Sequence, residues 1–406
     1  MRVAFVVQRY GLEVNGGAEL YCRKIAERLS RRFSVEVLTT CAIDYQTWKN
    51  EYKPGIHTVN GITVRRFPVD GPRRKMRFGL LSRVVFGGRH PERLEVSWMK
   101  AQGPYSSALF EFIEKEKGGY DCFVFITYLY CTTFFGLPLV REKAVLVPTA
   151  EDAPPLRLGI FKRLFNSPSA IVYCAPEEKA LVNRLFGNEG LPSDIIGTGI
   201  DMPVESDGER FRAKFAVADK FIVYVGRITP DKACGEMFAF FSRYKEERPG
   251  GLKLVLIGRA FMDVPAHPDI IQAGFVSEED KFDALCASSM LLMPSRFESL
   301  SIVLIEAWFS GRPVIVNAGC DVTRGQVERS GGGLAYDGYE AFRDAIDRLL
   351  GDERERGRLA ESGRAFAEAT YGWESVEGRY AALIESVCMA QGAGMRRTGL
   401  KTIPHG

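Results

Sequence analysis

The chain has 406 residues, of which 46% are apolar and 26% charged, and its formal net charge is +3. This length is large for one hydrophobic core and predicts two domains of about 200 residues each. This net charge says little about nucleic acid, and any basic partner surface must be local. We expect no nucleic-acid partner. The nine cysteines are scattered and include no Cys-x-x-Cys pair, which favours free thiols in a reducing cytosol over a zinc site or a disulfide framework.

The length of the apolar segments indicates in which cellular compartment the chain works. The first residues, MRVAFVVQRYG, are too short in apolar length for a secretory signal and lack a small-residue cleavage site. No stretch approaches the ~20 apolar residues that span a bilayer. We therefore expect a cytoplasmic chain.

The first half of the chain has the pattern of a parallel α/β domain. A continuous apolar run at 3–7 predicts a strand buried on both faces, a glycine-bearing loop follows at 8–17, and one apolar helical face covers 18–29. Further strands are expected around 35–38 and at 122–126, 144–147 and 170–173, with a helix at 176–187. The N-terminal domain is thus predicted at 1–200.

The second half repeats this rhythm. Buried strands are predicted at 221–225, 252–257, 291–293 and 314–316, and helices at 301–310 and 339–350. The chain is therefore predicted to be α/β, with two doubly wound, Rossmann-like parallel sheets facing across a cleft. A C-terminal domain is expected at 201–375, a C-terminal helix at 376–391, and a flexible tail at 392–406.

Two carboxylates carry the sharpest signal. Glu298 is predicted in a loop after a strand, and Glu306 lies eight residues on, inside the next helix. The backbone N–H groups of Ser299, Leu300 and Ser301 would lie at the positive end of that helix, where phosphate oxygens accept hydrogen bonds. Glu298 would then accept sugar hydroxyls and Glu306 a ribose diol. The alternative is a pair of surface glutamates near a helix start, where acids are favoured anyway.

A second signal follows the first strand of the second half. Gly226 precedes Arg227, and Lys232 lies five residues further on. Two cations at the end of a strand suit a diphosphate, because they neutralise the charge that builds on a phosphate leaving group. Two solvated basic side chains in a loop remain the alternative.

These motifs resemble a known family when they are taken in order. The spacing of Glu298 and Glu306 looks like the E-x7-E signature of glycosyltransferase family 4, and the Gly226-Arg227 strand end and the loop at 15–19 are similar to further parts of it. The segments at 256–258, 274–276 and 311–315 also sit in the family's order. The resemblance implies the GT-B fold, with the acceptor on the N-terminal domain and the donor on the C-terminal domain. It also implies that the helix at 376–391 packs back across both domains. It implies retaining, metal-independent transfer of a hexose-type sugar.

The resemblance also implies roles for individual residues. Arg227 and Lys232 would hold the donor diphosphate and, with Glu298, form the catalytic set. Donor contacts would come from Gly16, Gly17, Gly226, Gly258, Phe275, Val276, Ser299, Leu300, Ser301 and Glu306. The partner would be a nucleotide sugar, UDP-linked rather than GDP-linked, with no further cofactor and no metal.

One position departs from the family pattern. Many relatives carry a histidine in the first domain that reaches the donor sugar, whereas the matching loop here, 148–155, contains Glu151. Either an acid in this loop contacts the sugar instead, or donor choice differs, or activity is weakened. We assign Glu151 to a contact with the donor sugar.

A basic and apolar stretch at 73–93 is the last candidate feature. Glu92 is its only acid, and the rest mixes cations with apolar residues. It suits either a solvated basic loop or a segment that contacts an anionic membrane surface or glycan. We therefore expect a glycan or lipid-linked acceptor, in the synthesis of cell-surface polysaccharide or lipopolysaccharide, with peripheral contact to the inner face of the membrane.

A GT-B protein that binds nucleotide sugar without turnover, or a GT-B sugar-nucleotide epimerase, is the alternative function.

Overall fold

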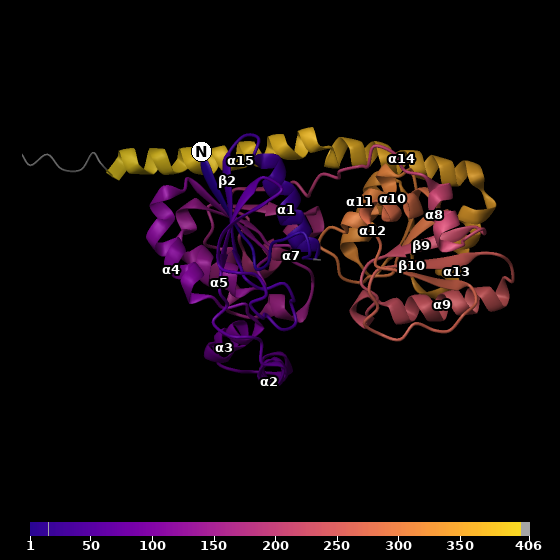
Figure 1. Ribbon diagram of the computed structural model, residues 1–406, viewed down its shortest axis with the longest axis horizontal. Helices are drawn as coiled ribbons and strands as arrows, with labels where there is room; N and C mark the ends of the chain where they lie inside the picture. The colour runs from indigo at the N-terminus through magenta and orange to yellow at the C-terminus, as the bar shows by residue number, and fades with distance from the viewer. Residues whose placement is uncertain (15, 399–406) are drawn as a thin grey trace, which may run out of the picture. The chain divides into compact units, whose positions relative to one another are not determined.

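The computed structural model describes residues 1–14 and 16–398, and the chain divides into two compact units (Figure 1). The first runs from Met1 to Thr198 and includes the segment from Val376 onward, and the second comprises Gly199–Ser375. Each unit is an α/β structure with its own sheet and its own core.

The first unit contains an eight-stranded sheet with the order β3-β4-β2-β1-β5-β6-β7-β8. Its strands are β1 (Arg2–Val6), β2 (Ser34–Thr40), β3 (Gly55–Val59), β4 (Ile62–Phe67), β5 (Cys122–Ile126), β6 (Ala144–Val147), β7 (Ala170–Tyr173) and β8 (Ser193–Ile195). β3 pairs antiparallel with β4, and the other paired strands of this sheet are parallel. The sheet is therefore parallel as predicted, with one antiparallel edge strand, β3, that the sequence analysis did not foresee.

The antiparallel pairing of β3 and β4 results from a hairpin whose turn residues have a recognisable sequence. Asn60 and Gly61 connect β3 to β4 with φ values of 47° and 80°. Positive φ at both central residues is the geometry of the tight Asn-Gly hairpin turn, which matches the right-handed twist of the flanking strands. The chain therefore reverses here instead of crossing over through a helix.

Helices pack around the first sheet, two of them at one end of the unit (Figure 1). They are α1 (Gly17–Leu29), α2 (Lys75–Gly87), α3 (Glu92–Gln102), α4 (Ser107–Glu116), α5 (Cys131–Gly136), α6 (Phe161–Phe165), α7 (Pro176–Phe186) and α15 (Trp373–Thr398). α7 begins at the predicted proline, and Gly187 ends it with φ 64°. The core of this unit is rich in aromatic rings, among them Trp98, Phe125 and Phe165.

Two expectations for the first unit differ from the structure. Residues 75–87, inside the basic stretch 73–93, form helix α2 and not the loop that was one of the two readings. Helix α15 is regular as far as Thr398, beyond residue 392, where we expected the flexible tail to begin. The remainder of that tail, 399–406, lies outside the described residues.

The second unit contains a six-stranded sheet with the order β11-β10-β9-β12-β13-β14, and all its paired strands are parallel. Its strands are β9 (Phe221–Val225), β10 (Lys253–Ile257), β11 (Ile270–Gly274), β12 (Met290–Met293), β13 (Val314–Asn317) and β14 (Gly333–Tyr336). Its helices are α8 (Gly208–Phe215), α9 (Cys234–Glu247), α10 (Glu278–Ala287), α11 (Ile302–Phe309), α12 (Asp321–Ser330), α13 (Gly338–Gly351) and α14 (Glu353–Tyr371). This is the doubly wound arrangement that the sequence predicts.

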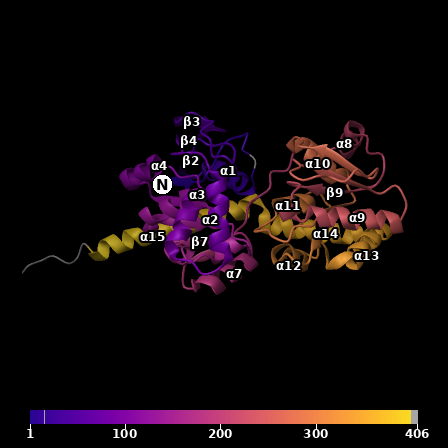
Figure 2. The ribbon, with the colours of Figure 1, turned by 90° about the horizontal axis from the view of Figure 1, so that it is seen from below.

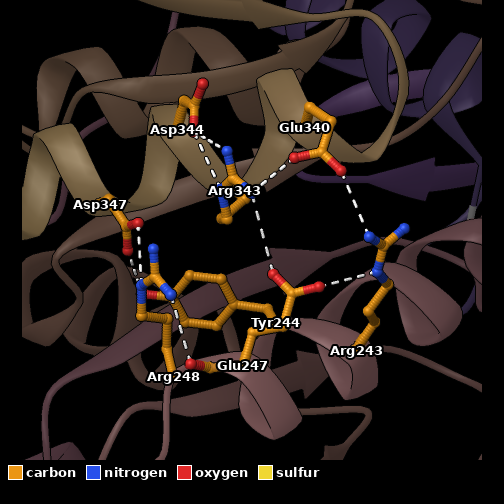
Figure 3. A network of polar contacts seen from close by, with 8 residues as sticks. All are labelled: Arg243, Tyr244, Glu247, Arg248, Glu340, Arg343, Asp344 and Asp347. Carbon is orange, nitrogen blue, oxygen red and sulfur yellow. Dashed lines mark hydrogen bonds and ion pairs between the residues drawn. The ribbon is translucent and has the colours of Figure 1, made fainter.

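Helices α9 and α13 pack on one face of the second sheet, and α10, α11 and α14 lie on the other (Figure 1). Phe241 of α9 and Phe342 of α13 are fully buried in the core under the first of these faces. Where the two helices reach solvent, a polar network joins them (Figure 3). In it, Arg243 contacts Glu340 at 3.2 Å, and Tyr244 donates to Asp347 at 2.8 Å. The Arg243–Glu340 ion pair is more than half-exposed and contributes little free energy, so the apolar core holds the helices together.

Candidate functional site

The carboxyl edge of the second sheet carries most of the predicted donor residues. Because its strands are parallel, they all end at this edge. β9 lies between β10 and β12, so the connections that follow β9 and β12 leave in opposite directions along the sheet. Ligands of doubly wound sheets bind at such a switch point. The loops after β9 and β12, at 226–233 and 294–301, contain Arg227, Lys232 and Glu298.

The structure brings Lys232 and Glu298 into direct contact. The Lys232 Nζ lies 2.7 Å from the Glu298 Oε1 and 3.3 Å from the carbonyl oxygen of Phe297. The two side chains are only 22% and 16% exposed, so the charges attract each other more strongly than at an open surface. The pair fixes a cation and a carboxylate side by side at the switch point.

Arg227 lies at the same edge and is held more loosely. Its guanidinium is half-exposed and lies 3.9 Å from a carboxylate oxygen of Asp231. Its backbone is fixed, because the hydroxyl of Tyr224 donates to the Arg227 carbonyl oxygen at 2.7 Å. A fixed backbone with an exposed guanidinium leaves the side chain able to turn toward an anionic ligand.

Helix α11 begins beside this pair. Ser301 precedes the helix in the left-handed conformation, with φ 60°, and its hydroxyl is buried. The Oγ of Ser301 and the Oγ1 of Thr229, which follows β9, have no hydrogen-bond partner among the residues that the structure describes. Buried polar groups are normally paired, so these two atoms can still form hydrogen bonds with a polar ligand or with water at this sheet edge. Leu300 is buried and Ser299 half-buried.

Glu306, predicted to contact the ribose, lies one turn inside α11 and is buried. Its Oε1 is 2.7 Å from the Nζ of Lys281, which also contacts Glu278 at 2.9 Å. Burial lowers the pKa of Lys281, but the charges of Glu306 and Glu278 outweigh it, and the net pKa is raised. Sequence reasoning missed Lys281, because a lysine in a helix rich in charge is typical of a solvated face.

Gly226 and Gly258 allow two strand-end loops to approach each other. Gly258 follows β10 with φ 137°, and a Cβ on it would lie 1.9 Å from the carbonyl oxygen of Gly226. No side chain fits there, so both the conformation and the space require glycine. Phe275 and Val276 follow β11 at the same edge, and Phe275 is 68% exposed.

A further polar cluster at this edge also escaped the sequence analysis. Arg296, in the loop after β12, lies 2.6 Å from the Glu236 Oε2, and Asn317, the last residue of β13, donates to the Glu236 Oε1 at 3.0 Å. The position of these residues in the sequence could have indicated the cluster, because Asn317 ends a buried strand and Arg296 lies three residues after one. No group of three or more His, Cys, Asp or Glu residues suitable for a metal ion occurs in the described part of the chain.

Gly16 and Gly17 lie in the first unit, at the start of α1 and the carboxyl end of β1. A Cβ on Gly16 would lie 2.1 Å from a carboxylate oxygen of Glu19, whereas Gly17 faces open space. Glu19 is buried and paired with Arg9, whose Nε donates to the Glu19 Oε1 at 2.8 Å. Gly16 therefore makes room for a buried ion pair, a role that the sequence analysis did not foresee.

Glu151 lies in the first unit, in the loop after β6, and the buried carboxyl group of Glu178 fixes this loop by hydrogen bonding. Glu178 of α7 accepts hydrogen bonds from the backbone N–H of Ala150 and of Cys174, each at 2.5 Å. Thr149 has φ 48°, so the chain turns sharply before Glu151. Burial raises the pKa of Glu178 to about 8, although its backbone hydrogen bonds lower it. The position of Glu151 thus depends on a carboxyl that the sequence did not single out.

Comparison with known proteins agrees with this geometry. Residues 206–366 match the family model described as "Glycosyl transferases group 1". The curated D-inositol 3-phosphate glycosyltransferase of Kribbella flavida is 25% identical over 255 residues, covering 57% of this chain and 60% of that protein. The same enzyme of Mycobacterium bovis is 26% identical over 257 residues, covering 58% and 52%. The chain thus spans about half to three fifths of the length of these relatives.

Solved structures match nearly the whole chain. HepE of Anabaena, in complex with UDP and glucose, has a TM-score of 0.71 at 17% identity, covering 95% of this chain and 100% of that one. Sucrose-phosphate synthase of Thermosynechococcus elongatus has a TM-score of 0.68 at 17% identity, covering 96% and 99%. The chain has the GT-B fold. Its two parallel-sheet α/β domains are those of GT-B glycosyltransferases. In the described residues, no helix is both long and apolar enough to cross a membrane.

Proposed function

We propose that the protein is a retaining glycosyltransferase of family 4, which moves a hexose-type sugar from a UDP-sugar to a glycan or lipid-linked acceptor in cell-surface polysaccharide or lipopolysaccharide synthesis. The observation that carries the proposal is the Lys232–Glu298 pair, held at 2.7 Å at the switch point of the second sheet. The match of 206–366 to a glycosyltransferase family model, and the UDP and glucose bound by a structural neighbour, support it.

In this proposal the second unit binds the donor. Arg227 and Lys232 hold the diphosphate, so no metal is required to neutralise it. The Lys232 ammonium turns from Glu298 toward a phosphate oxygen, and this frees Glu298 to accept hydrogen bonds from sugar hydroxyls. The unpartnered hydroxyls of Ser301 and Thr229 gain partners on the ligand.

The chemical step needs no protein nucleophile. The bond between the anomeric carbon and the phosphate oxygen breaks, and the acceptor oxygen bonds to that carbon on the same face. The acceptor proton passes to the leaving phosphate. Arg227 and Lys232 stabilise the charge that develops on this phosphate, and the rest of the catalysis is positioning. We assign the acceptor to the first unit, with Glu151 as a contact to the donor sugar.

The first experiment measures thermal unfolding with UDP-, GDP- and ADP-sugars in the presence of EDTA. A ligand at about 100 times its dissociation constant adds roughly 2.7 kcal/mol to the free energy of unfolding. We expect this with a UDP-sugar for the wild type, a smaller shift for Arg227→Ala, and the full shift for the control Arg354→Ala, an exposed arginine of α14. Equal shifts for wild type and Arg227→Ala would refute the phosphate role.

A second experiment separates transfer from binding and epimerisation. UDP released from UDP-sugar with acceptor present, and NMR of the product anomer, report transfer and retention. We expect Arg227→Ala to lower the turnover rate and Glu306→Ala mainly to weaken donor binding. Donor binding without any UDP release would assign the chain to the non-catalytic GT-B proteins, and a changed sugar on an intact nucleotide would assign it to the epimerases.

A further inference from the structure

Helix α2 of the first unit presents an apolar stripe to solvent. Met76, Leu80 and Val84 recur every four residues, which places them on one side of the helix, and they are 91%, 65% and 41% exposed. Arg77 and Arg83, both exposed, flank the stripe on its two sides. We call these five residues the α2 face. Exposed apolar side chains gathered in this way mark an interaction surface.

The opposite side of α2 is fixed to the protein, so the α2 face cannot turn inward. Val85 is buried in the core, and Phe78 packs against the core. The indole Nε1 of Trp98 in α3 donates to the Ser82 hydroxyl at 3.0 Å. Figures 1 and 2 show α2 and α3 together at one end of the first unit. The helix is thus apolar on both sides, and among the described residues of the first unit only one of these sides is packed against the core.

The charge around the stripe is of one sign. Residues 71–91 contain six arginine and lysine residues and no aspartate or glutamate. Within the described residues, Lys75, Arg77, Arg83 and Arg89 make no ion pair. Cations in the first turn also oppose the helix dipole, so folding alone does not favour them there. These charges suit an anionic partner outside the protein.

We propose that the α2 face docks on an anionic lipid surface. Basic residues contact headgroups while an apolar stripe between them enters the boundary with the acyl chains, as in helices that lie in the plane of a membrane. A nucleic acid would leave the three apolar side chains without a partner. A second copy of the same face would bring like charges together. The proposal does not depend on glycosyl transfer, although docking would bring a lipid-linked acceptor close.

The test is co-sedimentation of the purified chain with vesicles. One vesicle type is phosphatidylcholine alone, and the other contains about 30% phosphatidylglycerol, because the attraction depends on anionic lipid. The charge variant replaces three basic residues: Lys75→Gln, Arg77→Gln and Arg83→Gln. Each lysine or arginine near the surface contributes about a five-fold factor, so we expect binding to the anionic vesicles to fall about 100-fold. The matched control replaces three exposed arginines elsewhere: Arg31→Gln, Arg32→Gln and Arg354→Gln. We expect no change for it.

A second variant tests the apolar stripe: Met76→Ser, Leu80→Ser and Val84→Ser. We expect at least about a ten-fold loss of binding to anionic vesicles, because the serine side chains have no apolar surface to bury among the acyl chains. Since all three side chains are exposed, the free energy of unfolding should be unchanged, which thermal unfolding checks. Wild-type binding to phosphatidylcholine alone as strong as to the anionic vesicles would overturn the proposal, and so would no binding to either.

A reporter residue locates the contact. Leu80→Trp should show blue-shifted emission, quenched by brominated lipid, only with anionic vesicles. The control Val204→Trp, at a fully exposed position of the second unit, should show neither effect. Quenching of both would mean nonspecific adsorption and would overturn the assignment to α2. Size-exclusion chromatography that shows a wild-type dimer, and a monomer for the serine variant, would assign the face to a second copy of the chain instead.

Discussion

Glu178 predicts a pH dependence of stability in the first unit. Its carboxyl is fully enclosed near Cys174, Tyr21 and Tyr380, and the two tyrosine hydroxyls contact each other. Burial raises the pKa of Glu178 from 4.5 to about 8, whereas the hydrogen bonds from the Cys174 and Ala150 backbone N–H groups lower it. The folded chain therefore holds this proton at neutral pH, and the unfolded chain releases it.

The direction and size of the change in the free energy of unfolding with pH follow from proton linkage. Between pH 4.5 and 8 the folded state binds one more proton at Glu178 than the unfolded state. The free energy of unfolding therefore falls as the pH rises through this window, by about 1.4 kcal/mol per pH unit, and becomes level above it. Glu178→Gln removes the titrating group while it keeps the shape. From pH 5.5 to 7.5, the wild type should lose about 2.7 kcal/mol relative to this variant.

Hydrogen exchange followed by mass spectrometry is the appropriate assay. Trp48 and Trp98 lie in the first unit and Trp308 and Trp373 in the second, so intrinsic fluorescence would mix the two transitions. Peptides from β6, β7 and α7 report the first unit alone. The pH-dependent difference should appear there and be absent from peptides of the second unit. Parallel pH profiles of wild type and Glu178→Gln in the first unit would show that Glu178 is ionised in the folded state and refute the reasoning.

Two predictions concern the second unit. Gly258→Ala should cost about 3 kcal/mol or more in thermal unfolding, because its φ is strained for alanine and the Cβ meets the Gly226 carbonyl; a normal melting temperature would contradict the close approach. Lys281→Met should cost about 3–5 kcal/mol, because it removes the cation that pairs with the buried Glu306 carboxylate, and the double variant with Glu306→Leu should recover most of this loss. A double variant as unstable as the single one would mean that packing, not charge, is lost.

The buried strands of both sheets could be predicted from the sequence. β5, β6, β7 and β9 have the predicted bounds, because a strand covered on both faces is a continuous apolar run. β3 and β4 were missed for the converse reason. β3 is the edge strand, where Ile56 is 61% exposed, and β4 beside it contains the adjacent residues Arg65 and Arg66, so neither strand is a continuous apolar run. Only the Asn60-Gly61 turn signal could have revealed the hairpin.

Helix α2 shows how packing overrides a local preference. Its first turn contains Lys75 and Arg77 beside a positive helix end, Arg74 precedes it without a capping side-chain hydrogen bond, and Gly79 lies within the helix. Local rules therefore favour a loop. The helix forms because Phe78 and Val85 reach the core and Trp98 holds Ser82. A pattern with apolar residues on both sides of a helix has no single stripe, so the sequence did not distinguish the helix from a loop.

Strand order explains why the sequence could name Lys232 and Glu298 as candidates but not as neighbours. They are 66 residues apart, and β10 and β11 intervene before β12 returns to lie beside β9. Parallel strands connect through right-handed crossovers, so the step from β9 to β10 and the step from β12 to β13 place α9 and α11 on opposite faces. The loops between these diverging helices then share one stretch of sheet edge. If β12 lay instead beyond β11, two further strands at about 4.8 Å each would separate the same two side chains. The ion pair, and with it the proposed donor site, therefore depends on the order of the strands as much as on the residues themselves.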